Sequence, residues 1–540
     1  MDEISKNDVI ELSVTGQGMD GEGVARADGK TVFIRGALPG ERVRAKVISV
    51  KPRFDVAILE KIIAASPDRV APLCPVFGKC GGCDVQHMRY AAQLGFKRTL
   101  AIDALKKIGG FASAEVGEVI PSDEVFRYRN KLSLPVRRGG RIGLFAKGSH
   151  RVVETSDCLL QYENNRLLIA ALRDFMESEG YEGYDEQDFS GDIRHLVARE
   201  IGGRLYVAVV ATRSIDLGGF ASAVLGFSPD AEVWLNVNDR RDNVILGAAW
   251  KKVCGPDSPV VVDGLKTSLH PAGFFQVNDG VREKLYSFVA ALCSGGIAVE
   301  AYSGAGLMGA LVAKRADEVY GIEINREAHE AAVKLARDNG IDNMTPVLGD
   351  VAEMLPKVLG EIIEKRGDNR GTFLILDPPR GGVSPSVAAT VGGSGAENVV
   401  YVSCNPSTLA RDLRIICGYG YEIASVTPFD MFPQTANVET VVQLVRKIPD
   451  TYIDITVDMD ELDLTSSEAK ATYEEIKDYI FDKHRVKVSS LYVAQVKQKH
   501  GIIERDCYNN SKKDNTKQPQ CPPEKVKLIE EALRHFKMIL

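Results

Sequence analysis

The sequence predicts a multidomain α/β protein, and three observations support that prediction. Residues 9–62 alternate apolar and polar positions in short runs between glycine-rich turns, which is typical of a small antiparallel β-barrel. From about residue 265, apolar strand-like segments alternate with helical patterns, and this favours a doubly wound parallel sheet. The chain has 540 residues, of which 44% are apolar, so at about 150 residues per domain it has room for three or four domains.

The patterns divide the chain into four parts. We expect, in order, a small β-barrel, a central and mostly β domain, an α/β domain and a mostly α appended module, at residues 1–63, 64–262, 263–448 and 449–540. In the central part a helix over 91–108 should end at Gly109-Gly110, because glycine commonly follows the last turn of a helix. Strand-like alternation with many turns then fills 120–255.

The appended module differs from the rest in composition. It shows a polar helical pattern around Ser467 to Asp482, a charged break at Asn509 to Gln518 and a second helical pattern after Pro522-Pro523. No residues typical of a reaction centre stand out in it.

Composition narrows the class of protein. No apolar run reaches the ~18 residues of a membrane span, and the N-terminal Met-Asp-Glu-Ile-Ser-Lys lacks the basic and apolar regions of a signal peptide. We therefore expect a cytoplasmic monomer with no membrane partner. Ten cysteines in such a chain favour metal ligation or catalysis over a disulfide framework.

Basic residues gather in the N-terminal third, although the net charge is −7. Residues 26–53 hold eight Lys and Arg against two acids, and residues 87–151 hold thirteen against five. One such stretch alone is typical of a solvated face. Two within one third of the chain favour RNA or another polyanion as the partner.

A glycine-rich turn predicts a cofactor pocket of the Rossmann-like type. Gly304-Ala-Gly306-Leu-Met-Gly309 follows a predicted strand and opens a predicted helix, whose N-terminus offers free N–H groups to a polar ligand. Glu323 follows at the end of the next strand, where a carboxylate can accept both hydroxyls of a ribose. At this point an NAD enzyme, or a generic turn with a surface glutamate, would look the same.

Two further motifs end strands beside this pocket. Asp377-Pro-Pro-Arg380 forms a rigid turn after one strand, and Ser403-Cys404-Asn405-Pro406 ends the next. In a doubly wound sheet both motifs project into the same crevice. Cys404 is a candidate nucleophile there, although a lone cysteine at a strand end is equally typical of an inert core residue. Glu439, in Asn437-Val-Glu439-Thr, is a candidate base that would otherwise be a surface carboxylate.

Together with Phe274-Phe-Gln276-Val-Asn278, these motifs resemble the RNA uracil-5-methyltransferases, which use S-adenosylmethionine to make 5-methyluridine. The resemblance spans roughly residues 9–447, and the barrel resembles a TRAM domain, an OB-like fold of RNA-modifying enzymes. Cys404 is then implied to be the nucleophile and Glu439 the base. The residues implied to contact S-adenosylmethionine are Gln276, Tyr302, Glu323 and Asp377.

The residue types suit that chemistry. Carbon 5 of uracil is a poor nucleophile, so a Cys404 thiolate would add to carbon 6 and create an enolate whose carbon 5 can accept a methyl group. A base, Glu439, must then remove the carbon 5 proton before the thiolate leaves. The target base must leave its stack to be reached, so we expect a flipped uridine in a loop.

A second group of residues is a cysteine set. Cys74, Cys80 and Cys83 lie within ten residues, and Cys158 stands further on. Four thiolates suit zinc or an iron–sulfur cluster, with free reduced cysteines as the alternative, and His87 is a weaker candidate ligand than Cys158. The spacing resembles that of the iron–sulfur-containing 23S rRNA (uracil-5-)-methyltransferase branch of the same family, and this resemblance implies a [4Fe–4S] cluster.

The segment 126–131, Phe-Arg-Tyr-Arg-Asn-Lys, interleaves two aromatic residues with three cations. Ring faces for bases and cations for phosphates suit a looped single-stranded RNA. An ordinary β-strand with buried aromatic residues would show the same pattern.

The favoured hypothesis is a methyltransferase that forms 5-methyluridine in ribosomal (23S) RNA, because tRNA-acting relatives commonly lack both the cluster and the barrel. A tRNA substrate is the alternative. A radical S-adenosylmethionine enzyme would need a Cys-x3-Cys-x2-Cys triad, which the chain lacks. A non-catalytic RNA-binding factor is the third possibility, and the joint presence of Cys404, Glu439, Asp377 and Gln276 argues against it.

Overall fold

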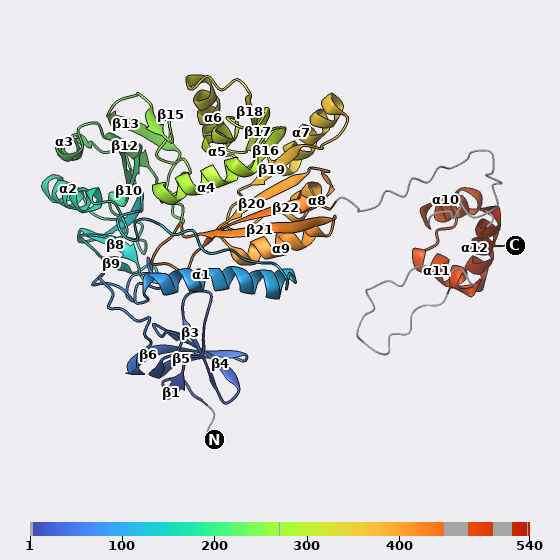
Figure 1. Ribbon diagram of the computed structural model, residues 1–540, viewed down its shortest axis with the longest axis horizontal. Helices are drawn as coiled ribbons and strands as arrows, with labels where there is room; N and C mark the ends of the chain where they lie inside the picture. Colours follow the sequence, from blue (N-terminus) through green and yellow to red (C-terminus); the bar gives the residue numbers. More distant parts are fainter. Residues whose placement is uncertain (1–3, 269, 448–472, 501–520, 537, 540) are drawn as a thin grey trace. The chain divides into compact units, whose positions relative to one another are not determined.

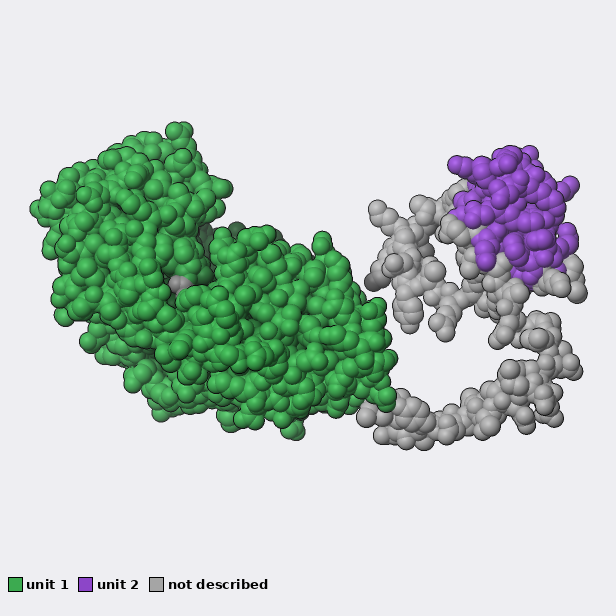
Figure 2. Space-filling model, turned by 90° about the horizontal axis from the view of Figure 1, so that it is seen from above, with its two compact units in different colours: residues 1–448 green, residues 449–540 purple. Residues whose placement is uncertain are grey.

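The computed structural model describes residues 4–268, 270–447, 473–500, 521–536 and 538–539. The chain forms two compact units, residues 1–448 and residues 449–540 (Figures 1 and 2). Among the described residues, no helix has both the length and the apolar character needed to cross a membrane.

The N-terminal part is a six-stranded sheet around its own small core (Figure 1). Its strand order is β1-β5-β6-β4-β3-β2, with bounds β1 Val9–Ser13, β2 Gly16–Gln17, β3 Gly23–Ala27, β4 Lys30–Arg35, β5 Arg42–Val50 and β6 Phe54–Ala64. The alternating apolar residues expected to face inward do so, with Val32, Ile34, Val43 and Ala45 fully buried. The β4–β6 pair is parallel, which a purely antiparallel barrel does not contain.

A long helix follows the cysteine-bearing loop. Helix α1 (Tyr90–Ala104) continues as one π-helical turn, η1 (Leu105–Gly109), and ends at Gly110, whose φ is 80°. Ala101, Ala104 and Leu105 join the core of the α/β domain, so α1 packs against that domain although it precedes the central sheet in sequence.

The central part is a seven-stranded sheet with two helices. Its order is β13-β12-β11-β10-β7-β8-β9, with bounds β7 Lys131–Arg137, β8 Arg141–Phe145, β9 Val152–Glu154, β10 Ile193–Ile201, β11 Arg204–Ala211, β12 Glu232–Val237 and β13 Ala249–Cys254. Helices α2 (Asn164–Glu179) and α3 (Gly218–Phe227) share one apolar core with one face of this sheet. The other face carries a smaller apolar cluster that includes Val197, Val210 and Trp234.

A short hairpin, β14 (Val260–Val262) and β15 (Leu265–Thr267), leads into the α/β domain. Its seven-stranded sheet has the order β18-β17-β16-β19-β20-β22-β21. The strands are β16 Ile297–Ala301, β17 Glu318–Glu323, β18 Met344–Leu348, β19 Thr372–Leu376, β20 Asn398–Ser403, β21 Tyr421–Phe429 and β22 Glu439–Arg446. Strands β16 to β20 are parallel, and β22 pairs antiparallel with both β20 and β21.

Helices cover both faces of this sheet, as a doubly wound fold requires. One core contains residues of α1, α7, α8 and α9, and the other contains residues of α4, α5 and α6. The helices are α4 Asp279–Leu292, α5 Leu307–Val312, α6 Arg326–Asp338, α7 Val351–Arg366, α8 Pro385–Gly393 and α9 Pro406–Cys417. The strand order reverses at β16, between β17 and β19, so the ligand crevice is expected at the carboxyl ends of these strands.

The second unit is a helical bundle. It contains α10 (Tyr473–His484), α11 (Ser490–Lys499) and α12 (Pro523–His535), which enclose a core of their own around Ile480, Val493 and Ile529. The start of the helix expected near Ser467, and the charged break at Asn509 to Gln518, lie outside the described residues.

Candidate active site

Five elements deliver the motif residues to one edge of the α/β sheet. The glycine turn follows β16, Glu323 ends β17, Asp377 follows β19 and Cys404 follows β20. Glu439 begins β22, which runs antiparallel to β20, and Ser403 pairs with Thr440 in the register. The start of β22 therefore lies beside the end of β20, so Cys404 and Glu439 are neighbours although 35 residues separate them.

The glycine turn and Glu323 are joined by hydrogen bonds. Gly304 N–H donates to Glu323 Oε2 at 2.9 Å, and Asn325 N–H donates to Glu323 Oε1 at 2.6 Å. Gly306 has a φ of 77°, and a Cβ there would lie 2.9 Å from Ala332 Cβ, so this position requires glycine. Tyr302, just before the turn, has a φ of 65°. The carboxylate oxygens of Glu323 keep further lone pairs for a ligand.

Three carboxyl groups are close together beneath this edge. Glu300 and Glu439 are 1% and 3% exposed, and Asp377 follows the neighbouring strand. Burial raises the pKa of Asp377 to about 7. Burial and the nearby Asp377 charge raise the pKa of Glu300 to about 8 and hold the pKa of Glu439 well above its ordinary value. Burial and mutual repulsion therefore both disfavour ionisation of all three groups together.

Arg380 supplies the positive charge nearest to the thiol. Burial, and then the Glu439 charge, raise the pKa of Cys404 to about 11, while the Arg380 guanidinium acts in the opposite direction. Arg380 Nη2 donates to Asn437 Oδ1 at 3.4 Å, and Arg380 O accepts from Asn405 Nδ2 at 3.2 Å. The Asp377–Arg380 turn thus contacts both the segment of the thiol and the segment of the base.

Gln276 lies in the segment that enters α4. Its side chain is buried, and its carbonyl accepts from Asn130 Nδ2 at 2.9 Å. Asn278 caps α4 by accepting from Val281 N–H at 3.3 Å. Burial, and then the carboxylates of Asp377 and Glu300, raise the pKa of Tyr286 on α4. Helix α4 therefore connects the Gln276 segment with the carboxyl cluster.

Arg380 and Glu300 are functional candidates to which the motifs assigned no role. Arg380 belongs to the Asp377–Arg380 motif, so the sequence placed it near the predicted crevice. Glu300 ends an apolar strand and differs from other strand-end glutamates only in its burial, which the sequence pattern does not reveal.

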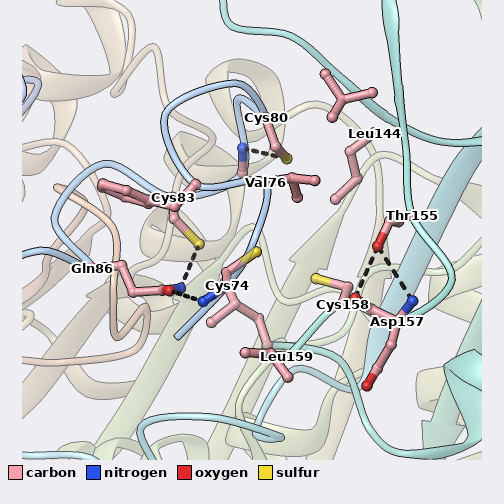
Figure 3. Close-up of a pocket in the computed structure, with 14 residues that line it drawn as sticks. Cys74, Val76, Cys80, Cys83, Gln86, Leu144, Thr155, Asp157, Cys158 and Leu159 are labelled. Atoms are coloured by element: carbon pink, nitrogen blue, oxygen red, sulfur yellow. Dashed lines mark hydrogen bonds between the residues drawn. The ribbon is translucent and has the colours of Figure 1, made fainter. Parts of the chain in front are cut away.

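The four cysteines line one pocket (Figure 3). Cys74, Cys80 and Cys83 come from the loop before α1, and Cys158 comes from the segment after β9. Polar groups hold the loop in place: Cys74 N–H donates to Gln86 Oε1 at 2.7 Å, and Cys158 N–H donates to Asn165 Oδ1 at 3.0 Å. His87 is buried but does not line this cavity.

Across the described part of the chain, no three His, Cys, Asp or Glu side chains converge closely enough to hold a single metal ion. Burial, and then the other three thiols, raise the pKa of Cys83, and a bound cation would reverse that effect. The structure therefore does not show the metal centre that the cysteine spacing predicts, and the [4Fe–4S] cluster stays a proposal.

The basic aromatic segment 126–131 has two kinds of residue. Tyr128 is buried and its hydroxyl donates to Pro433 O at 3.0 Å, while Arg127 pairs with Asp157 at 2.7 Å. These two side chains therefore serve the fold. Within the described ranges, Arg129 and Lys131 form no ion pair.

Comparison with known proteins agrees with this architecture. Residues 267–447 match the family described as tRNA (Uracil-5-)-methyltransferase, and residues 5–56 match the TRAM domain. An uncharacterized RNA methyltransferase of Halalkalibacterium halodurans is 37% identical over 457 residues, which cover 82% of this chain and 98% of the relative. An uncharacterized RNA methyltransferase of Clostridium tetani is 35% identical, with coverage of 81% and 96%.

A solved structure is similar over the same extent. The Pyrococcus abyssi tRNA (uracil-54, C5)-methyltransferase, determined with S-adenosyl-L-homocysteine, is 29% identical with a TM-score of 0.66. The match covers 81% of this chain and 99% of that one. The expected TRAM domain and methyltransferase fold are thus confirmed, with S-adenosylmethionine as the cofactor and RNA as the substrate. The chain belongs to the RNA uracil-5-methyltransferase family and carries an N-terminal TRAM domain.

Proposed function

We propose that this enzyme forms 5-methyluridine in ribosomal (23S) RNA through a covalent adduct between Cys404 and carbon 6 of a flipped uridine. The observation that carries the proposal is the pairing of β20 with β22, which sets Cys404 beside Glu439. We further propose that it acts as a cytoplasmic monomer, in which residues 1–63 and 64–262 grip RNA and residues 263–448 transfer the methyl group.

The residues divide the reaction between them. The Cys404 thiolate adds to carbon 6, and the electron pair of the 5,6 double bond moves onto the uracil carbonyl as an enolate. Bound S-adenosylmethionine supplies an electrophilic methyl group to carbon 5. Glu439 then takes the carbon 5 proton, the 5,6 double bond re-forms and the thiolate leaves. Arg380 favours the thiolate before addition and after elimination.

The cofactor residues surround the glycine turn. We assign Glu323 to the ribose hydroxyls, because it ends β17 at the switch point and its oxygens keep free lone pairs. Tyr302 and the glycine turn follow the adjacent strand, β16. Asp377 and Gln276 complete the proposed set, and a cationic cofactor beside Asp377 would favour its ionised form.

We assign a [4Fe–4S] cluster to Cys74, Cys80, Cys83 and Cys158, with a structural or RNA-positioning role, because methyl transfer requires no electron. Iron and sulfide analysis of anaerobically purified protein, with Cys158→Ala as the comparison, tests the assignment. Four iron atoms per chain in the wild type and fewer in the variant are expected. A large change of methylation rate between the reduced and oxidised protein would contradict the non-redox role.

Transfer RNA is the second candidate substrate. The solved relative modifies a tRNA uracil, and the matching family carries tRNA in its description. The cysteine set and its resemblance to the 23S branch favour ribosomal RNA. A non-catalytic RNA-binding role is a weaker third candidate.

Methylation of purified ribosomal RNA and purified tRNA, each followed by mass mapping, separates the candidates. The RNAs should come from a strain that lacks the gene. We expect a new 5-methyluridine in 23S RNA with the wild type and none with Cys404→Ala. Modification of tRNA alone would replace the substrate, and cofactor binding without turnover on either RNA would favour the non-catalytic role.

A further inference from the structure

Two cations lie opposite each other on neighbouring strands of the central sheet. Strands β7 and β10 are antiparallel, and Lys131 lies directly opposite Arg199 in their register. Directly opposed side chains occupy the same face of a sheet, and like charges in this position destabilise the pair. Arg129, two residues before Lys131, adds a third cation. Repulsion among these side chains lowers the stability of the free protein, and a bound anion would reduce that repulsion.

No acid in the described part of the chain neutralises these three cations. None of them forms an ion pair there. Arg199 is only 4% exposed, its Nε has no hydrogen-bond partner, and its Nη1 donates to Phe275 O at a long 3.4 Å. Glu200 lines a pocket with Arg129 and Arg199 but accepts instead from Asn164 Nδ2 at 3.0 Å.

Burial and mutual repulsion both disfavour the charged forms of Lys131 and Arg199. Burial, and then the charges of Arg199 and Arg129, lower the pKa of Lys131 to about 8. Burial, and then Arg129, lower the pKa of Arg199 to about 10. A bound anion would reverse both shifts.

The cations are attached to the segment that leads into the catalytic edge. Asn130 N–H donates to Val277 O at 2.9 Å, and Arg199 contacts Phe275 O. An anion held by Lys131 and Arg199 would therefore lie next to Gln276, one of the proposed cofactor residues. This location suits a group attached to the reacting base, such as the backbone near a flipped nucleotide.

The same sheet face carries aromatic rings. Leu132, Leu196 and Val233 point toward α2 and α3, so their sequence neighbours point to the other face. The chain's two tryptophans, Trp234 and Trp250, lie on that face and contact each other and His270, with ring centroids 4.6 to 6.4 Å apart. Strand β11 lies between Trp234 on β12 and Arg199 on β10, so a single strand of RNA that crosses this face would meet both rings and cations.

We propose that Lys131, Arg199 and Arg129 form a phosphate-binding site for the backbone of the RNA substrate, beside the segment that carries Gln276. This assignment adds an RNA contact to the proposed function, and the identity of the ligand as RNA rests on that function. It differs from general basic attraction because it names three specific cations, one of which, Arg199, is buried and has an unpartnered Nε.

The test is the salt dependence of RNA binding by the full-length protein. The probe is a short single-stranded oligouridine, titrated between about 50 and 200 mM salt with wild type and Lys131→Gln. Loss of one phosphate contact should weaken binding and reduce the slope of log K against log salt by about 0.7. An unchanged slope would overturn the site.

Thermal stability distinguishes a binding role from a structural one. Because Lys131→Gln removes a like-charge repulsion, the Tm of the free protein should stay the same or rise. A lower Tm with an unchanged salt slope would mean that Lys131 serves only the fold. Arg213→Gln is the matched control, since exposed Arg213 already pairs with Asp192 at 2.8 Å and should leave the slope unaltered.

Two further arms identify the ligand and separate this site from the proposed reaction. Inorganic phosphate should displace the oligouridine no better than sodium chloride of equal ionic strength. If phosphate displaces the oligouridine at a much lower ionic strength than sodium chloride does, the assignment to RNA is overturned. Methylation by the wild type is measured separately. A reduced slope without methylation would support the site and reject the proposed reaction, whereas methylation with an unchanged slope would do the opposite.

Discussion

At the scale of single residues, the site combines a thiol, an arginine and a set of crowded carboxyl groups. Burial and the Glu439 charge disfavour the Cys404 thiolate, and Arg380 opposes them. The nucleophile is therefore weak in the free enzyme at neutral pH, because only the thiolate attacks. A positively charged cofactor and the uracil ring would both enter next to these carboxyl groups.

Arg380→Gln should move the pH dependence of kcat/KM to higher pH. Below the pKa of Cys404 the thiolate fraction rises with pH, so kcat/KM should rise with pH in the wild type. Loss of the guanidinium raises that pKa further, and each added unit lowers the thiolate fraction about tenfold at a given pH. Steady-state methylation between pH 6 and pH 10 measures the shift.

Arg370→Gln is the control for this prediction, because Arg370 is exposed and pairs with Asp368 at 2.5 Å. Arg380→Lys should recover part of the activity at neutral pH. A pH profile that is the same for Arg380→Gln and wild type would show that the arginine does not act on the thiol.

Individual residues were predictable where a motif marks them. Cys404, Asp377 and Glu323 stand at the ends of strand-like segments and Glu439 in a recognisable motif, and the structure places all four at one edge of one sheet. Their roles stay proposals. The Lys131–Arg199 pair was not predictable, because opposition across two strands depends on a register that joins residues 68 positions apart. Tyr128 pointed inward although its neighbours are cations, because alternation along a strand does not say which face is buried.

At the scale of elements, helix α1 and the cysteine loop hold the segment before Glu439. Lys97 Nζ donates to Asp430 Oδ1 at 2.5 Å, both side chains being fully buried. Gln93 Nε2 donates to Gln434 Oε1 at 3.0 Å, and Gln434 O accepts from the Asp84 and Val85 N–H groups at 3.1 Å. Asp84 follows Cys83, so the cysteine loop and the segment before Glu439 share one hydrogen-bond network.

Lys97→Met should destabilise this network. Removing one partner of a buried ion pair leaves the Asp430 charge uncompensated, which costs about 3–5 kcal/mol of unfolding free energy. We expect a clear fall in the Tm of the main thermal transition and a lower kcat, since the segment that positions Glu439 loosens.

The double variant Lys97→Met, Asp430→Asn distinguishes the charge from the packing. It removes the stranded carboxylate and should recover most of the lost Tm. Equal Tm values for the single and double variants would contradict the assignment of the cost to the buried charge.

The elements themselves were predictable in part. The strand–helix alternation after residue 265 and the helix over 91–108 appear in the structure as expected. Helices α2 and α3 of the central part were not expected, because their apolar residues lie among many turn-like segments. The parallel β4–β6 pair was also not expected, since alternation specifies which face of a strand is buried but not the direction of its partner.

At the scale of the whole molecule, the catalytic machinery lies in the unit of residues 1–448. The relative from Halalkalibacterium halodurans is matched over 98% of its length by 82% of this chain, so nearly a fifth of this chain has no counterpart in that match. The helices of residues 449–540 enclose a core that shares no residue with the cores of the first unit.

A protein ending at residue 448 should therefore fold and methylate RNA. We expect its kcat to stay within a factor of about two of the full chain, because a unit with its own core folds independently. Scanning calorimetry should lose one transition and keep the other. Aggregation of the shortened protein, or loss of most of its kcat, would show that the first unit depends on the second.

A covalent complex between Cys404 and the substrate RNA is the decisive evidence for the proposed reaction. With S-adenosylmethionine and substrate RNA, Glu439→Gln should accumulate a protein–RNA complex that survives denaturing gel electrophoresis, because the methylated adduct cannot release its carbon 5 proton. Mass spectrometry should place the bond on Cys404, and Cys404→Ala should form no complex. A Glu439→Gln enzyme that turns over normally with no trapped complex would contradict covalent catalysis by this pair.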